Sequence, residues 1–360
     1  MLTTFMATLL ALQLGPAAHV SGPVELPPPP EQVLAVPEEL RAAFRERVVD
    51  VRRSPEQRLA RLVEFVFDEN GLGVEYQPDA SLTVSEVYQA RKANCLSSTF
   101  LIVALAREAG LDAYGQQIDR VLSWGSTGEI VMQSMHANAI IEVERRRFVV
   151  DVNASDATAA SDALQPVSDQ KLLALYYGNR AMELMVAGRQ SEAKPWLDEA
   201  LRHAPLDPTL LNNAGVLSLR TGDSVAAEKY FLSAIEQSRE LMSGLSNLVA
   251  FYKNRGDDSR VAMWESRADS VLRKDPYYQY TLGRQLELAG NYVEAAKQYR
   301  RAIALNRKEH QFHFGLARVY FSMGDSRAAD RELSAAYKLS LGNARDRYGD
   351  KLAALRKRNL

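Results

Sequence analysis

A spacing of thirty-four residues organises the second half of this sequence. Glycines recur at this interval, at Gly188, Gly222, Gly256, Gly290 and Gly324. Alanines keep the same interval, at Ala200, Ala234, Ala268, Ala302 and Ala336. A third column of small residues consists of Ala193, Ala227, Val261, Ala295 and Ala329. Because glycine suits a tight turn and a small residue lets two antiparallel helices cross closely, these columns predict five consecutive helical hairpins.

The repeated unit resembles the tetratricopeptide repeat. The units start near Ala174, Pro208, Met242, Pro276 and His310. The bulky position of that family is filled by Leu184, Ser218, Tyr252, Leu286 and Tyr320. The tryptophan of the family's fourth position is replaced by residues such as Tyr177 and Leu211. The resemblance implies an all-α tetratricopeptide-repeat solenoid over residues 170–342, closed by a polar capping helix over residues 343–360.

Solenoids of this kind present a concave surface lined by the first helix of each unit. The positions that usually face this surface carry Asn212, Tyr277, Tyr280, Arg284 and Arg318. These side chains are mostly aromatic or basic, and so we expect the surface to bind an extended peptide or an acidic C-terminus of a protein partner. The alternative is that the repeats only brace the first domain.

Residues 38–165 carry a different pattern, which predicts an α+β domain. Residues 95–109 read as a helix closed by Gly110, and the middle of this helix is apolar on every face, so that it needs cover on all sides. Two amphipathic helices precede it, near residues 38–51 and 55–68, with Ser54 as the N-cap of the second. The alternating pattern that follows predicts antiparallel strands at residues 113–118, 135–143 and 148–152.

The only cysteine of the chain, Cys95, opens the predicted central helix. A thiol at this place lies at the positive end of the helix dipole, which favours the thiolate and a nucleophilic role. Such a nucleophile needs a base, and His136 is the one histidine of the five that falls in the α+β domain. The alternatives are that Cys95 is a small buried hydrophobe and that His136 is a hydrogen-bonded core histidine.

Asp151 lies on the predicted strand that follows the strand of His136. Their odd separation of fifteen residues lets both side chains point to the same face of a hairpin, where a carboxylate would orient the imidazole. A turn centred on Arg145 and Arg146 leaves the two residues diagonal to each other.

Three short segments, ANCLSSTFLIVALAREAGLDA, MHANAIIEV and FVVDVN, resemble the transglutaminase-like superfamily of cysteine enzymes. The resemblance covers about residues 55 to 160 and implies a papain-like domain. It implies Cys95 as nucleophile, His136 as general base and acid, and Asp151 as the residue that orients His136. Ala93 departs from the glycine of many members. The family acts on amides by hydrolysis, deamidation or acyl transfer, and some members are thought to be inactive.

The N-terminal residues 1–22 predict a secretory signal, because an apolar core from Phe5 to Leu14 is followed by small residues. No lysine or arginine precedes Arg41, which is unusual for such a signal. An exported protein, periplasmic or secreted, is the expectation, and a cytoplasmic protein with an apolar tail is the alternative. Residues 23–37 are rich in proline and predict a stiff linker without helix.

The formal net charge of −1 provides no field that would attract nucleic acid, and no stretch after the leader has the length of a membrane span. We expect no cofactor and no metal site. His310 and His313 share a helix face, but no cysteine or carboxylate accompanies them at the spacing of metal ligands, and so we expect them to pack within the repeats. The sequence therefore predicts a transglutaminase-like cysteine peptidase or amidase that acts on a protein or peptide amide, with the repeats binding substrate or partner. The alternative is a catalytically silent domain in a repeat-based protein-interaction scaffold.

Overall fold

The structure is a computed structural model that describes residues 25–49, 53–77, 81–127, 130–152, 164–340 and 342–358. The predicted signal segment 1–22 lies outside these residues. The chain divides into two compact units, of which the first ends at Gly256 and the second begins at Asp257. The division falls inside the third helical repeat.

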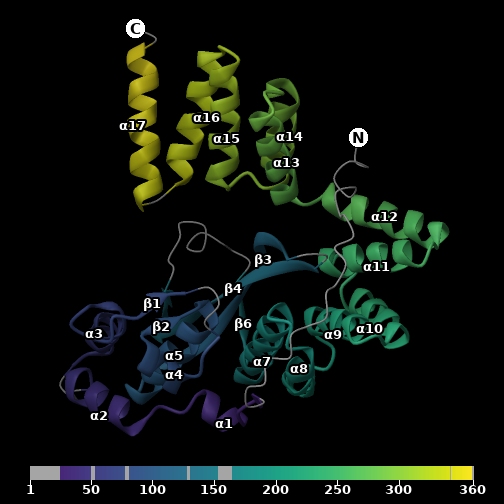
Figure 1. Ribbon diagram of the computed structural model, residues 1–360. Coiled ribbons are helices and arrows are strands. Elements are labelled where there is room, and N and C mark those ends of the chain that lie inside the picture. The colour runs from purple at the N-terminus through teal and green to yellow at the C-terminus, as the bar shows by residue number, and fades with distance from the viewer. Residues whose placement is uncertain are drawn as a thin grey trace. The chain divides into compact units, whose positions relative to one another are not determined.

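The first unit begins with helices that surround a small sheet (Figure 1). Its early helices are α1 (Pro30–Val33), α2 (Glu38–Arg47), α3 (Pro55–Phe67), α4 (Val84–Ala90) and α5 (Cys95–Glu108). A four-stranded antiparallel sheet has the order β5-β4-β3-β6, with β3 at Asp112–Thr127, β4 at Ile130–Val143, β5 at Arg146–Val150 and β6 at Leu164–Val167. Two short parallel strands, β1 (Glu75–Tyr76) and β2 (Lys92–Ala93), form a separate pair. The predicted combination of a central helix with an antiparallel sheet is therefore present.

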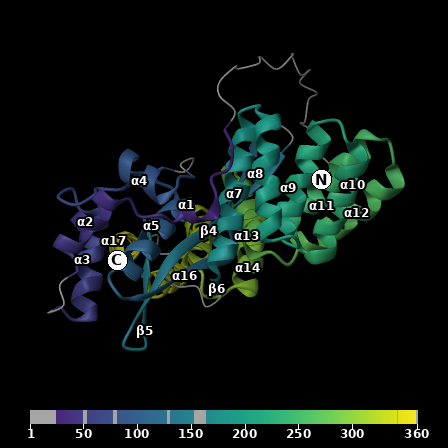
Figure 2. The same ribbon diagram turned by 90° about the horizontal axis from the view of Figure 1, so that it is seen from below.

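Helix α5 is the centre of the first unit, and it lies beside β4 in both Figure 1 and Figure 2. The side chain of Asn94 accepts a hydrogen bond from the Ser97 N–H at 2.9 Å, which caps the helix at its start. Gly110 ends it with a φ of 69°, as the sequence predicts. Between these ends, residues 96–103 are all buried, so that the helix has almost no solvent face.

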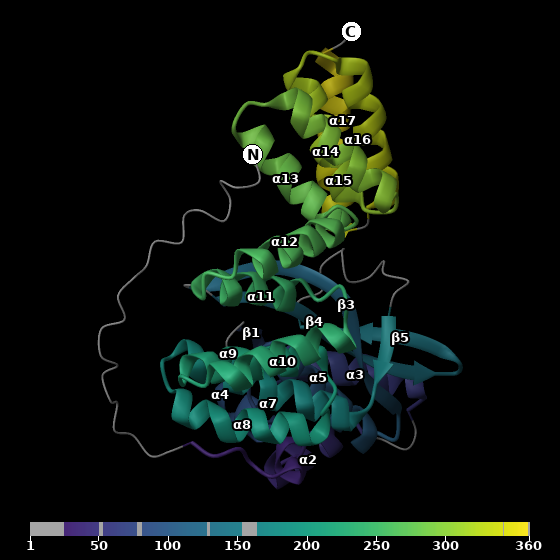
Figure 3. The same ribbon diagram turned by 90° about the vertical axis from the view of Figure 1, so that its right-hand side faces the viewer.

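The helical hairpins predicted from the repeat are confirmed. In the first unit they comprise α7 (Asp169–Val186), α8 (Gln190–His203), α9 (Pro208–Arg220), α10 (Ser224–Gln237) and α11 (Met242–Asn254). Figure 1 shows α7, α8, α9 and α10 side by side in this order, and Figure 3 shows the same four helices from the side. The second unit comprises α12 (Asp258–Leu272), α13 (Pro276–Leu288), α14 (Tyr292–Leu305), α15 (His310–Ser322), α16 (Ser326–Leu339) and the C-terminal helix α17 (Gly342–Arg358).

The backbone conformation at the repeat turns requires the column of glycines. All five glycines have a φ between 68° and 88°, and a Cβ added at any of them would meet no atom within 4 Å. Space is therefore available for a side chain, and it is the left-handed turn between the two helices that requires glycine. The alanine column is fully buried except at Ala268, which is partly exposed on α12 together with Val261.

Several local expectations were wrong. The proline-rich segment, expected to be a stiff linker without helix, contains a helical turn, α1, and its residues Glu25 and Pro28 accept hydrogen bonds from side chains of α7 and α8. Strand β6 has no counterpart in the sequence prediction. The β4–β5 turn is centred on Glu144 and Arg145, which have φ values of 50° and 66°, one residue earlier than predicted. None of the described helices has the length and hydropathy needed to cross a membrane.

The turn after α3 should tolerate no side chain at Gly71. A Cβ at this position would overlap the backbone carbonyl of Phe65 and lie 2.9 Å from the carbonyl oxygen of Glu64. We expect Gly71→Ala to lower the free energy of unfolding by about 2–3 kcal/mol, because backbone atoms must move to admit the methyl group. Urea denaturation followed by circular dichroism measures this loss.

Asn70→Ala is the matched control, because the exposed Asn70 side chain precedes the same turn. It should change the free energy of unfolding by no more than about 0.5 kcal/mol. Equal stabilities of the two variants would contradict the backbone overlap.

Candidate functional site

The N-terminus of α5 holds Cys95 in a polar, hydrogen-bonded setting. Asn94 is buried, and its amide Nδ2 donates to the Ser81 hydroxyl at 2.9 Å while its Oδ1 caps the helix. The carbonyl oxygen of Cys95 accepts hydrogen bonds from the hydroxyls of Ser98 at 3.0 Å and Thr99 at 2.7 Å. The Cys95 side chain is half-buried. The thiol is thus the first side chain of a fixed helix and stands at the positive end of its dipole.

Tyr76 lies near the start of α5, because β1 pairs with β2 and sets Tyr76 opposite Ala93, two residues before Cys95. The Gln77 N–H donates to the Ala93 carbonyl at 3.0 Å. Burial raises the pKa of Tyr76, and the charges of Cys95 and Asp151 act in the same direction. The phenol is therefore within electrostatic reach of both residues. The sequence reasoning missed Tyr76, since a two-residue strand within a loop leaves no periodic signal.

The backbone of His136 lies on β4, where it pairs with Ile118 of β3. Strand β3 follows α5 after a short turn and packs against it. From Asp112 to Ile118 the strand covers roughly 20 Å, and the 14 residues of α5 cover about 21 Å, so that we expect the Ile118–His136 pair to lie near the start of α5. The side chain of His136 lies outside the described part of the structure.

Asp151 immediately follows β5, and its side chain is half-buried. Strands β4 and β5 pair Ala139 with Val150, and one further step in this register sets Asp151 opposite Asn138. Residues 136 and 138 share a face of β4, and so His136 and Asp151 are diagonal neighbours on one face. This register is continued one residue past the end of β5, and the contact between the His136 and Asp151 side chains stays a prediction.

A second candidate site is a cavity of about 480 Å³ in the second unit, which we call the terminal groove. Helices α13, α15, α16 and α17 line it, with Glu287, Phe314, Arg318, Phe321, Lys351 and Leu355 among the lining residues. It is mainly apolar, and Phe321 is 46% exposed at its edge.

One carboxylate organises the polar side of the terminal groove. Glu287 accepts two hydrogen bonds from Arg318, at 2.9 and 2.6 Å, and one from the Tyr299 hydroxyl at 2.6 Å. The hydrogen bonds to Glu287 raise the pKa of Arg318. The guanidinium carbon lies 5.2 Å from the centre of the Phe314 ring, a cation–π arrangement that fixes the ring at the cavity wall.

The predicted groove residues separate into two groups. Tyr277 and Tyr280 of α13 pack against Phe312 with ring centres 5.1 and 5.3 Å apart, and Arg284 and Arg318 both act electrostatically on Tyr280. Asn212 does not lie at a surface: it is buried in the first unit.

The Asn212 Oδ1 accepts a hydrogen bond from Asn247 at 2.9 Å. The prediction missed Phe314 and Phe321, although their spacing of four and three residues from Arg318 places all three on one face of α15.

The two histidines of α15 make packing and hydrogen-bond contacts. His310 Nδ1 lies 3.0 Å from the Tyr348 hydroxyl, and His313 Nδ1 lies 2.9 Å from a carboxylate oxygen of Glu332. Within the described residues no group of three or more histidine, cysteine, aspartate or glutamate side chains could hold a metal ion.

The tetratricopeptide repeat family model matches residues 179–240 and 280–348. A relative, the Cell division cycle protein 16 homolog of Homo sapiens, is 24% identical over 179 residues. The match takes in 49% of this chain and 24% of the relative, so that the chain spans about a quarter of that protein's length.

Solved structures also match, each over about half of this chain. YrrB, a TPR protein with an unusual peptide-binding site, is 18% identical with a TM-score of 0.26, covering 50% of this chain and 92% of YrrB. TTC0263, a thermophilic TPR protein of Thermus thermophilus, is 22% identical with a TM-score of 0.26, over 50% of this chain and 99% of that one.

PilF of Pseudomonas aeruginosa is 14% identical with a TM-score of 0.28, over 52% of this chain and 90% of that one. Such scores carry no argument about function. The matched family model and the helical hairpins together establish tetratricopeptide repeats in the C-terminal half of the chain.

Proposed function

We propose that this chain is a protein-interaction scaffold and that its terminal groove binds an extended peptide with a large apolar side chain next to carboxylates. The apolar cavity of about 480 Å³ carries this proposal. A cavity of this size, with aromatic walls and a few polar groups at one side, is typical of a site that takes up one anchoring side chain of a partner.

The charges around the terminal groove favour an acidic peptide. Arg318 is already paired with Glu287, and this pair contributes little net charge. Arg284 and Lys351 are exposed and have no ion-pair partner among the described residues. Since Arg284 is three residues before Glu287 on α13, the two share a helix face. An acidic side chain of the peptide can therefore meet two unpaired cations.

Phe321→Ala should weaken the binding of a labelled test peptide, Gly-Glu-Glu-Phe-Glu-Glu-Gly, by about tenfold. Truncating an aromatic side chain that packs on a bound peptide typically costs about 1–2 kcal/mol, which corresponds to this factor. Fluorescence anisotropy with the full chain gives the dissociation constants. The same peptide with lysine in place of glutamate should bind at least about fivefold more weakly to the unaltered protein.

Arg284→Glu tests the charge contribution, and Arg301→Glu is its matched control. Neither arginine is among the residues that line the cavity, but Arg284 shares a face of α13 with the lining residue Glu287, whereas Arg301 is exposed on α14. The two replacements change the net charge equally. Arg284→Glu should raise the dissociation constant of the acidic peptide severalfold, whereas Arg301→Glu should leave this dissociation constant unchanged. Equal weakening by both variants would indicate attraction by overall charge and would rule out the groove as the binding site.

A second candidate function is amide chemistry at Cys95, as the resemblance to the transglutaminase-like superfamily implies. Three points support it: Cys95 begins α5, the lengths of α5 and β3 lead us to expect His136 near the same end of the helix, and the charges of Cys95 and Asp151 both act to raise the pKa of Tyr76. In this proposal the Cys95 thiolate attacks the carbonyl carbon of an amide, and the amine leaves with a proton from His136. Water or a second amine then attacks the thioester and releases the thiol.

His136→Ala should slow the alkylation of Cys95 by iodoacetamide at pH 7 at least about tenfold, because the thiol loses the base that removes its proton. Asp151→Asn should slow it less, since the base is retained but no longer oriented by a carboxylate. The chain has one cysteine, so that the mass gained by the intact protein reports this single site.

His313→Ala serves as the histidine control, because His313 belongs to the second unit. It should leave the alkylation rate of Cys95 unchanged. An unchanged rate in a folded His136→Ala variant would remove the case for thiol catalysis and leave the interaction function untouched.

A further inference from the structure

The proline-rich segment before α1 lies on the first helical hairpin as a bound peptide would. Residues Glu25 to Pro29, which we call the proline strap, read Glu-Leu-Pro-Pro-Pro. Pro29 has φ −63° and ψ 150°, the values of a polyproline II helix. This conformation needs no internal hydrogen bonds, and so its backbone groups are available to a partner surface.

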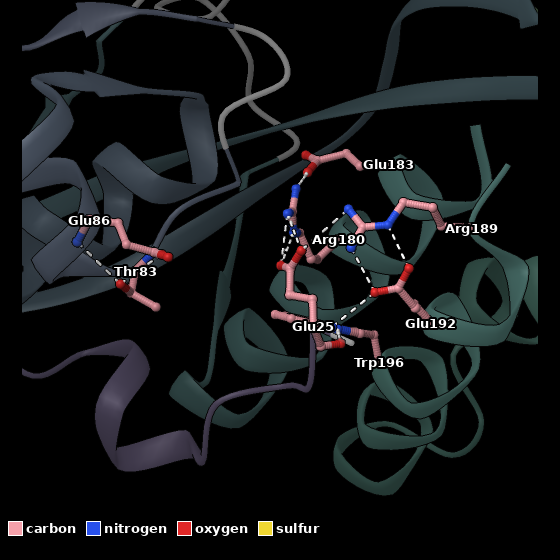
Figure 4. A network of polar contacts seen from close by, with 8 residues as sticks. All are labelled: Glu25, Thr83, Glu86, Arg180, Glu183, Arg189, Glu192 and Trp196. Carbon is pink, nitrogen blue, oxygen red and sulfur yellow. Dashed lines mark hydrogen bonds and ion pairs between the residues drawn. The ribbon is translucent and has the colours of Figure 1, made fainter. Parts of the chain in front are cut away.

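The carboxylate, the backbone N–H and the carbonyl oxygen of Glu25 all form hydrogen bonds with side chains of α7 and α8 (Figure 4). Its carboxylate accepts two hydrogen bonds from Arg180, each of 2.8 Å. Its backbone N–H donates to Glu192 at 2.9 Å, and its carbonyl oxygen accepts from the Trp196 indole at 2.9 Å. Such a two-pronged arginine contact combined with two main-chain hydrogen bonds recognises both a side chain and an extended backbone.

The proline part of the strap meets an aromatic surface. The Tyr177 hydroxyl donates to the Pro28 carbonyl at 2.7 Å. The rings of Tyr177 and Trp196 lie 6.0 Å apart, and Tyr176 contacts both. Burial raises the pKa of Tyr177 to about 12, so that the hydroxyl stays protonated and donates over the whole physiological range. Aromatic rings that also donate hydrogen bonds are the usual surface for proline-rich peptides.

Arg180 and Glu192, which contact the strap, also have partners within the α7–α8 hairpin. Glu183 accepts from Arg180 at 2.8 Å, and Glu192 accepts two hydrogen bonds from Arg189 at 2.7 and 2.6 Å. The hydrogen bonds from Arg189, followed by that from the Glu25 N–H, hold the pKa of Glu192 at about 2. Arg180 and Glu192 therefore keep their positions and charges when Glu25 leaves. Leu26, in contrast, is 66% exposed and contributes little to the contact.

We propose that the α7–α8 surface is a recognition site for an acidic, proline-rich peptide segment of a partner protein, and that the proline strap occupies this site in the resting chain. The bound strap defines the ligand chemistry: a glutamate, one variable residue and then prolines. A tethered ligand acts at an effective concentration in the millimolar range, so that a partner segment competes only after the strap is loosened. The site uses other residues than the terminal groove, and each proposal can fail alone.

The test uses the full chain and a fluorescein-labelled synthetic peptide, Val-Glu-Leu-Pro-Pro-Pro-Pro, with the sequence of residues 24–30. Glu25→Arg replaces the carboxylate of the strap by a cation that Arg180 repels. We expect this variant to bind the peptide at least about tenfold more tightly than the unaltered protein. Glu39→Arg, an equal charge change at an exposed position of α2, should bind it no better than the unaltered protein.

A charge exchange identifies the contact itself. The single variant Arg180→Glu, in which the strap's own Glu25 is repelled, should not bind the wild-type peptide but should bind a peptide that carries arginine in place of glutamate. The double variant Glu25→Arg with Arg180→Glu restores the pairing of the strap and should bind the arginine peptide at least about tenfold more weakly than Arg180→Glu does. In protein labelled with ¹⁵N-tryptophan, the Trp196 indole N–H signal should shift in Glu25→Arg and return towards its original position when the wild-type peptide is added.

Two results overturn the proposal. One is a folded Glu25→Arg variant that binds the peptide no more tightly than the unaltered protein, even at millimolar peptide concentration. The other is binding without any change in the Trp196 signal, because the peptide then lies elsewhere. Glu25→Gln is the milder variant if Glu25→Arg does not fold, and it should show the same direction of change with a smaller factor.

Discussion

The burial of α5 determines the arrangement of the first unit. This helix is apolar through its middle on every side, and residues 96–103 are all withdrawn from solvent. A helix without a solvent face must be covered by several elements at once. Helices α2, α3, α4 and α7 and strands β2, β3 and β4 all contact it. Cys95 is the exception at its open end, since the helix starts where the cover is incomplete and the thiol is only half-buried.

The same burial joins the repeats to the α+β part within the first unit. Phe100 of α5 meets Tyr176 of α7 edge to face, with ring centres 5.8 Å apart. Tyr176 in turn contacts Tyr177 and Trp196, the rings beneath the proline strap. The first repeat thus buries one side of α7 against the domain core and offers the other to the strap. A single aromatic cluster stabilises the central helix and also provides the proposed peptide site.

The features that could be predicted from the sequence depend on residues close together in the chain. The start of α5 follows from the capping side chain of Asn94, and the repeat turns follow from the need for a left-handed glycine. The sequence reasoning missed Tyr76 and the ion pair of Glu25 with Arg180, because each depends on residues far apart in the chain. Asn212 fits the repeat pattern of a groove residue, yet a hydrogen bond to Asn247 satisfies it inside the first unit.

Both proposed peptide sites contain an arginine paired with glutamate beside aromatic rings, and the difference between them lies in where that glutamate comes from. Arg318 is paired by Glu287, which belongs to the terminal groove itself, so that any selectivity for acidic peptides must come from the unpaired Arg284 and Lys351. Arg180 is paired by Glu25, which belongs to the strap. Removing the strap leaves Arg180 paired with Glu183 but takes away the two hydrogen bonds that its Nε and Nη2 donate to Glu25. The α7–α8 site therefore favours being occupied at all times, by the strap or by a partner that carries the same carboxylate.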